Sequence, residues 1–297
     1  MDTSGGSDTA ARARWAAAFL GSAAVLLGGY PYTLYDGAIG VAAVGVAAAI
    51  LILAGVLLGS AGLALGVPLL VRALRTPVPL TVLLVAAGVA TLAVLTVVMA
   101  IPYGNLMALM VLGGSQLAYV EPGARPTDPA TRFRIALPFS AAMLALLPIM
   151  ILQVTVWNPL AKLPGLSLDQ IYGRLAAVGE PTGAPIIIVW AVVWGGLALA
   201  FPVFCRLGRK STVATTRRVV IAGLLLVAMV GYTSWITAFG MGMSMADTFE
   251  QAPSGGDAAP VGKIIAMVGQ LSAVAALFVG CPAWRPRLAD PVPVGSR

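Results

Sequence analysis

The segment from Pro185 to Cys205, PIIIVWAVVWGGLALAFPVFC, decides the fold class of this chain. It carries no charged residue, and a helix of about 20 apolar residues is long enough to cross the hydrocarbon core of a bilayer. The whole chain has the same character, because 59% of its 297 residues are hydrophobic and only 10% are charged, against about 25% in ordinary soluble domains. We therefore predict an all-α fold, a polytopic transmembrane helical bundle, and exclude soluble and disordered proteins.

Seven other apolar runs of comparable character predict further membrane spans. The eight predicted spans are about 15–31, 38–71, 78–101, 103–120, 135–157, 185–205, 219–243 and 263–281. Residues 15–281 then form a single transmembrane bundle, with a mobile tail at 1–14 and a second tail at 282–297. Arg12 and Arg14 precede the first run as in a signal peptide, but no A-x-A-like cleavage site follows it, so we predict a retained helix.

The basic residues predict the orientation of these spans. If 103–120 crosses the membrane and the N-terminus lies inside, 15 of the 18 basic residues fall in cytoplasmic segments, and only Lys162, Arg174 and Lys263 fall outside. This segregation follows the positive-inside rule, so we predict that both tails are cytoplasmic. It also explains the net charge of +7 without a nucleic-acid partner. The excess of arginine over lysine is typical of a GC-rich bacterial genome, which predicts a bacterial cytoplasmic (inner) membrane.

The long predicted outer loop, 158–184, contains a helix signal. Ser167 and Gln170 have the spacing of a capping box, in which two side chains satisfy backbone N–H groups at the start of a helix. Gly179 is a suitable helix stop. Apolar residues fall on one helical face between these two points: Leu168, Ile171, Tyr172, Leu175 and Ala176. We predict one short amphipathic extracytoplasmic helix that lies on the membrane surface or seals the bundle, rather than a gate.

Residues that the chain lacks exclude several chemistries. There is no histidine, which removes histidine-ligated haem and zinc and histidine-based nucleophile systems. Cys205 and Cys281 are too distant for a CxxC motif and end two predicted spans on the cytoplasmic side, so we predict two free thiols. Met241, Met243 and Met245 carry thioethers that suit Cu(I), but a helix points Met243 away from the other two, which favours core packing. We predict no catalytic residue, metal site or cofactor.

Neutral polar residues provide the predicted ligand-binding set. The run 103–120 is short and interrupted by Gly113 and Gly114, and a broken helix frees backbone groups that can bind an uncharged solute or an ion. The predicted ligand-binding residues are Tyr103, Asn105, Ser115, Gln116 and Gln153. Gln270 adds a neutral polar group to the last span. The alternative interpretation is that the glutamines only hydrogen-bond between helices.

Glycines in the second span predict close helix packing. Gly55 and Gly59 form a GxxxG motif, and Gly62 and Gly66 continue the series. Small residues let helix backbones approach closely within a membrane. Packing inside this bundle is favoured over homodimerisation through the same face.

Three classes of function remain open at this stage. We predict a translocation component for a neutral solute or an ion: a small permease, a channel or the membrane subunit of a transporter. The first alternative is a non-catalytic accessory, assembly or immunity subunit of a membrane complex. A lipid-processing enzyme is the least favoured class, because neither interface carries a catalytic acid, base or metal cluster. The predicted partners are the lipid bilayer and proteins of a membrane complex.

Overall fold

A computed structural model of the chain describes residues 4–28, 42–74, 113–114, 116–117, 125–208, 215–250 and 258–281. Every regular element in these ranges is a helix. The elements are α1 (Ser4–Gly28), α3 (Ala42–Leu74), α6 (Pro129–Leu152), the π-helix η1 (Gln153–Trp157), α7 (Asn158–Lys162), α8 (Leu168–Val178), α9 (Ala184–Leu207), α10 (Thr216–Thr248) and α11 (Pro260–Val279). The all-α prediction is confirmed for this part of the chain.

Five helices are long and apolar enough to cross a membrane, which suits a multi-pass membrane protein. They are Val44–Val71, Pro129–Lys162, Ala184–Leu207, Thr216–Thr248 and Pro260–Val279, and they overlap the predicted spans 38–71, 135–157, 185–205, 219–243 and 263–281. The helix α1 covers most of the predicted span 15–31 and begins at Ser4, inside the predicted tail. Two predicted spans lie outside the described residues: 78–101 entirely, and 103–120 except for four residues. Eight spans with both tails cytoplasmic stays a prediction.

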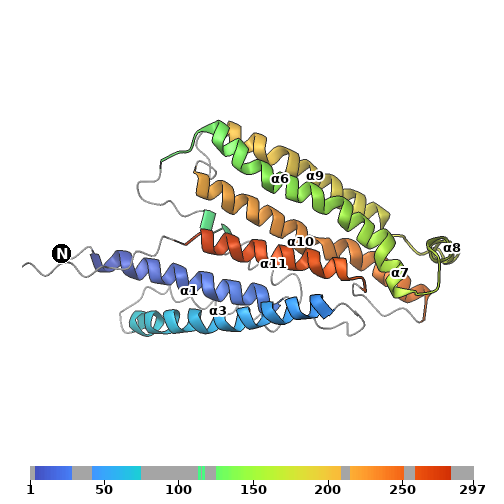
Figure 1. Ribbon diagram of the computed structural model, residues 1–297, viewed down its shortest axis with the longest axis horizontal. Helices are drawn as coiled ribbons and strands as arrows, with labels where there is room; N and C mark the ends of the chain where they lie inside the picture. Colours follow the sequence, from blue (N-terminus) through green and yellow to red (C-terminus); the bar gives the residue numbers. More distant parts are fainter. Residues whose placement is uncertain are drawn as a thin grey trace, which may run out of the picture.

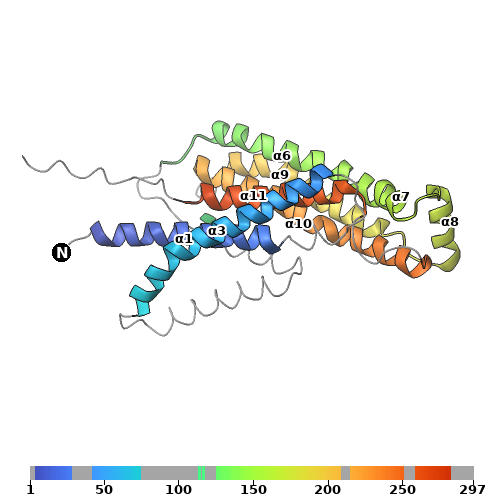
Figure 2. The same cartoon turned by 60° about the horizontal axis from the view of Figure 1, so that its bottom comes forward.

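The helices lie roughly side by side, with α10 in the middle of the bundle. It contacts α6 and α9 on one side and α11 on the other, and α11 in turn contacts α1, which pairs with α3 (Figures 1 and 2). Hydrogen bonds join the starts of α6 and α10, where Thr127 and Thr216 hydroxyls lie 3.0 Å apart. We call this end of the bundle, where α6 and α10 begin and α9 and α11 finish, the basic end.

Glycines explain how α3 approaches α1. A Cβ atom on Gly62 would lie 2.8 Å from the Cγ atom of Leu20, and one on Gly55 would lie 3.0 Å from the Cγ atom of Leu27. The GxxxG series therefore faces α1, and its predicted role in packing within the bundle is confirmed. The opposite face of α3 carries exposed apolar side chains suited to lipid contact: Val46, Ile50, Leu53, Val56 and Leu57.

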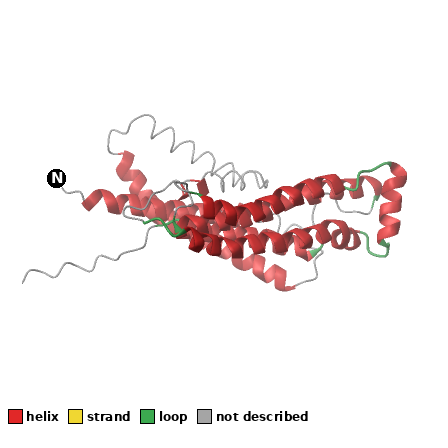
Figure 3. Ribbon diagram, turned by 90° about the horizontal axis from the view of Figure 1, so that it is seen from above, coloured by secondary structure: helices red, strands yellow, loops and turns green. Residues whose placement is uncertain are grey.

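The helix α8 lies across the end of the bundle opposite the basic end (Figure 3). Its capping box is formed as predicted, and Gly179 ends it in the left-handed conformation at φ 77°. Ile171 and Leu175 are fully buried against the bundle. The Tyr172 hydroxyl donates to the carbonyl oxygen of Thr155 at 2.7 Å, and burial raises the pKa of Tyr172, which keeps this donor protonated. The predicted short amphipathic helix is confirmed and seals this end; its side of the membrane stays a prediction.

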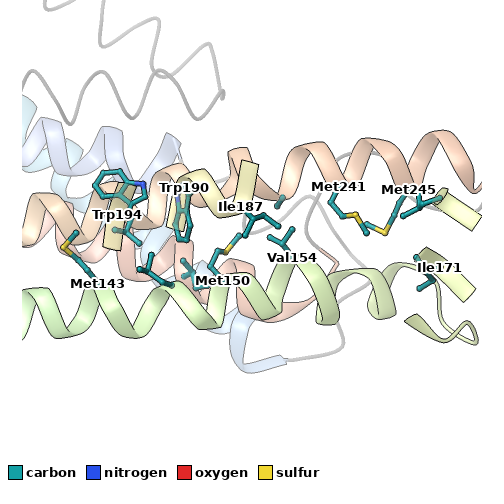
Figure 4. Close-up of a cluster of buried hydrophobic side chains, with 14 of the residues drawn as sticks. Met143, Met150, Val154, Ile171, Ile187, Trp190, Trp194, Met241 and Met245 are labelled. Atoms are coloured by element: carbon teal, nitrogen blue, oxygen red, sulfur yellow. The ribbon is translucent and has the colours of Figure 1, made fainter. Parts of the chain in front are cut away.

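Methionine and tryptophan fill much of the core between α6, α9 and α10 (Figure 4). Met241 and Met245 lie one helical turn apart and are fully buried, whereas Met243 is 37% exposed. The segment is helical, so the three sulfurs do not share a face. This arrangement agrees with the packing interpretation of the methionine cluster.

Candidate functional site

Arginines from two helices bind the end of α11 at the basic end. The Arg14 Nη2 group donates to Gln116 Oε1 at 2.8 Å and to the carbonyl oxygen of Gly280 at 3.4 Å. The Arg217 Nε group donates to the carbonyl oxygen of Val279 at 2.8 Å, and its Nη2 group also donates to that of Gly280. The last carbonyls of a helix have no partner within it and form the negative end of its dipole. The two guanidinium groups give these carbonyls hydrogen-bond donors and place positive charge at the negative end of the α11 dipole.

The same arrangement occurs at the end of α9. Arg132, which is only 5% exposed, donates from Nη1 to the carbonyl oxygen of Gly208 at 2.8 Å. Arg132 starts α6, so this bond ties α6 to α9 as Arg217 ties α10 to α11. Three of the arginines at the basic end are therefore used for helix capping.

Three aromatic side chains lie next to Arg14, between α1 and α11. The rings of Trp15 and Phe278 have centroids 6.0 Å apart, and Phe19 lies 5.4 Å from Phe278. Ala18 and Leu277 pack together beside these rings and are fully buried. This part of the α1–α11 contact is apolar and closely packed.

Buried polar groups lie further along the contact between α1 and α11, away from the basic end. Gln270, which is 3% exposed, donates from Nε2 to the carbonyl oxygen of Val25 at 3.3 Å and so satisfies a carbonyl in the last turn of α1. The Gln270 Oε1 atom is buried and accepts no hydrogen bond from the described residues. The Ser22 hydroxyl is fully buried and also has no partner among them. We call Ser22, Val25 and Gln270 the α1–α11 polar site.

The helix register places the members of this site at neighbouring levels. Ala18 packs on Leu277, and Val25 packs on Ala273. Ser22 lies one turn from both Ala18 and Val25 on α1, so it lies between these two contacts. One acceptor and one hydroxyl thus occur together in an otherwise apolar helix contact.

Positive charges lie toward both ends of α11 from the polar site. Arg14 lies toward the basic end, and Lys263, which is 4% exposed, lies two helical turns from Gln270 on the same face of α11. The described residues place no carboxylate within this contact. A site with an acceptor, a hydroxyl and flanking positive charge suits a neutral hydrogen-bonding molecule better than a cation.

The structure separates the predicted ligand-binding residues that it describes. Gln116 lies at the basic end and accepts from Arg14, whereas Gln153 is fully buried in η1, at the far end of α6. Tyr103, Asn105 and Ser115 lie outside the described residues. Gly113 packs closely against α10, because a Cβ atom on it would lie 2.6 Å from the Cδ2 atom of Leu225, whereas a Cβ atom on Gly114 would meet no atom within 4 Å.

One member of the site and one helix crossing near it escaped the sequence analysis. Ser22 lies in an alanine-rich run, where a single hydroxyl gives no signal of its own. The close crossing of α10 and α11 joins Gly231 to Gly269, which belong to different spans and form no motif along the chain. Only Gln270 stood out in the sequence as a polar residue within an apolar run.

Both cysteines are free and buried, in agreement with the two predicted thiols. Burial raises the pKa of Cys281 to about 11, although the guanidinium groups of Arg14 and Arg217 act to lower it. At pH 8 about one Cys281 side chain in a thousand is then a thiolate, the form that reacts with alkylating reagents.

We expect iodoacetamide to label native Cys281 very slowly at pH 8, with a rate that rises about tenfold per pH unit until the pH approaches the pKa. Intact mass spectrometry after defined reaction times measures this rate. Protein unfolded in SDS without reductant serves as the control and should gain two adducts. Fast native labelling at pH 8, or fewer than two adducts after unfolding, would contradict this prediction.

Comparison with protein-family models, with curated proteins and with solved structures finds no match to this chain.

Proposed function

We propose that the protein is a translocation component of a membrane and that the α1–α11 polar site binds a small neutral solute on its way across. The observation that carries this proposal is that two buried groups of the α1–α11 contact, Ser22 Oγ and Gln270 Oε1, have no hydrogen-bond partner among the described residues. The proposal also takes up the predicted topology of eight spans with both tails cytoplasmic.

The physical argument rests on the cost of unused polar groups. A buried donor or acceptor without a partner costs about 1–3 kcal/mol, and an apolar bundle offers no bulk water to replace the partner. Buried hydroxyls such as Ser234 and Thr237 avoid that cost by bonding to carbonyl oxygens of their own helix at 2.7 and 2.5 Å. The Ser140 hydroxyl of α6 also has no partner among the described residues, but no second unused polar group of the α1–α11 contact accompanies it. A solute that accepts from Ser22 and donates to Gln270 would remove the cost at the polar site.

Glycerol and urea are suitable probes, because both are neutral and both donate and accept hydrogen bonds. We expect proteoliposomes of the full chain to take up at least one of them faster than protein-free liposomes in stopped-flow light scattering. Ser22→Ala and Gln270→Leu should each reduce the protein-dependent rate about tenfold, because each removes one hydrogen bond to the solute.

Ser244→Ala is the matched control for Ser22→Ala. The Ser244 hydroxyl is buried too, but it donates to the carbonyl oxygen of Gly240 at 3.2 Å within α10, so its removal should leave the rate unchanged. Size-exclusion profiles establish that all variants are folded. Liposome-like rates for both probes, or wild-type rates in both site variants, would refute the proposal.

A non-catalytic accessory subunit is the second candidate, and the exposure of α3 favours it. This helix contacts mainly α1, and several of its outward side chains are half exposed or more, such as Leu57 and Ile50 at 61% each. A partner's membrane helix would bury this face. Purification from native membranes in mild detergent tests this candidate. An accessory subunit should co-purify with a partner protein in stoichiometric amount, and the Leu57→Trp variant should lose that partner.

A further inference from the structure

Five arginines of the basic end fall into two groups. Arg14, Arg132 and Arg217 point inward and bind carbonyl oxygens, as described above. Arg134 and Arg206 are exposed, and neither forms a hydrogen bond or an ion pair with a described residue. Helix capping therefore does not explain the second group.

Arg134 and Arg206 lie at the outer edge of the α6–α9 pair. The Arg206 guanidinium carbon lies 5.9 Å from the centroid of the Phe133 ring, which holds the end of α9 against the start of α6. Arg134 follows Phe133 directly on α6. Phe133 thus lies beside the Arg206 guanidinium group and next to Arg134 in the chain, where α6 and α9 reach the basic end.

An apolar surface continues from these arginines along the same helices. Leu199 and Val203 share a face of α9 with Arg206, because they precede it by seven and three residues. Leu137 and Leu144 lie on the neighbouring side of α6. All four are exposed, at 64%, 49%, 43% and 37% in this order. The surface combines positive charge at one end with exposed apolar side chains along both helices.

We propose that this surface binds an anionic phospholipid, with its phosphate between Arg134 and Arg206 and an acyl chain along Leu137, Leu144, Leu199 and Val203. Guanidinium groups bind phosphate oxygens through paired N–H donors. The acid at the start of α6 is Asp128, whose carboxylate already caps α6 by accepting from the backbone N–H of Thr131 at 3.0 Å. Charge and apolar exposure together select a phospholipid over a small anion, because only the lipid has acyl chains to cover the exposed apolar side chains.

Native mass spectrometry of the detergent-purified full chain tests the proposal with phosphatidylglycerol and phosphatidylethanolamine as probes. We expect phosphatidylglycerol to bind about tenfold more tightly, and Arg134→Gln/Arg206→Gln to lose this preference. Arg174→Gln removes one charge at the opposite end of the bundle and should keep the preference. Excess inorganic phosphate should displace little lipid.

Several outcomes would overturn the proposal. Equal affinity of the wild type for the two lipids would do so without any variant, and so would an unchanged preference in the double variant. Displacement by inorganic phosphate would indicate a small-anion site in place of a lipid site. The Arg134→Lys/Arg206→Lys variant keeps the charge and should retain a preference for phosphatidylglycerol; loss of that preference in a folded Lys variant also counts against the proposal.

Discussion

Gly231→Ala is expected to destabilise the protein by about 1–2 kcal/mol, and Gly231→Leu by more. A Cβ atom at this position would lie 2.9 Å from the Cα atom of Gly269 and 3.1 Å from the carbonyl oxygen of Ile265. Both neighbours belong to the backbone of α11, so the contact is relieved only if the two helices move apart. Overpacking of this kind costs about 1–3 kcal/mol, and the higher helix propensity of alanine recovers about 1 kcal/mol.

Gly196→Ala is the matched control for this prediction. Gly196 lies inside α9, and a Cβ atom there would meet no atom within 4 Å, so only the gain in helix propensity applies. Thermal unfolding in detergent, followed by tryptophan fluorescence, should therefore show a lower melting temperature for Gly231→Ala and an equal or higher one for Gly196→Ala. Equal melting temperatures for both variants would mean that α10 and α11 do not cross this closely.

The position of Gly231 also explains why the sequence predicted one close glycine contact and gave no prediction for another. The Gly55 series repeats every three or four residues on one helix, so a pattern along the chain predicts its packing face. The partners Gly231 and Gly269 each provide a single glycine to a crossing between two spans. No local pattern connects them, and only the relative placement of α10 and α11 does.

Local signals in the sequence predicted α8 well for the same reason. The capping box and Gly179 act on the backbone of their own helix, and the apolar residues of α8 identify its buried face. The π-helix at Gln153–Trp157 has no comparable signal, because it accommodates contacts with other elements, among them the bond from Tyr172 to Thr155. The candidate site depends on such contacts between elements. The sequence therefore predicted that the spans contain polar residues, but it did not predict which groups these residues contact.

Charge patterning predicted where arginines lie but not what they bind. The positive-inside rule places arginines at one end of each helix and treats Arg132 and Arg134 alike. In the structure Arg132 is buried and caps α9, while Arg134 is exposed two residues later. The difference comes from the helical rotation of about 200° between them, which turns one side chain inward and the other outward.

Arg217→Met is expected to lower the free energy of unfolding by about 2–4 kcal/mol. The Arg217 side chain donates to the carbonyl oxygens of both Val279 and Gly280, and a hydrogen bond from a charged group contributes about 1.5–3 kcal/mol. Removing the buried part of a charge also removes its desolvation cost, so the net loss is smaller than two full bonds. Arg134→Met is the control, since it deletes the same charge at an exposed position of the same end.

Thermal or SDS-induced unfolding in a neutral detergent without anionic lipid measures the difference between these two variants. Arg217→Lys should fall between Arg217→Met and the wild type, because a lysine ammonium keeps the charge near the dipole of α11 but cannot reproduce the planar pair of donors. Such an order would show that the capping geometry stabilises the bundle in addition to the charge. Equal unfolding of Arg217→Met and Arg134→Met would instead mean that Arg217 contributes only net charge, and that α11 ends without help from α10.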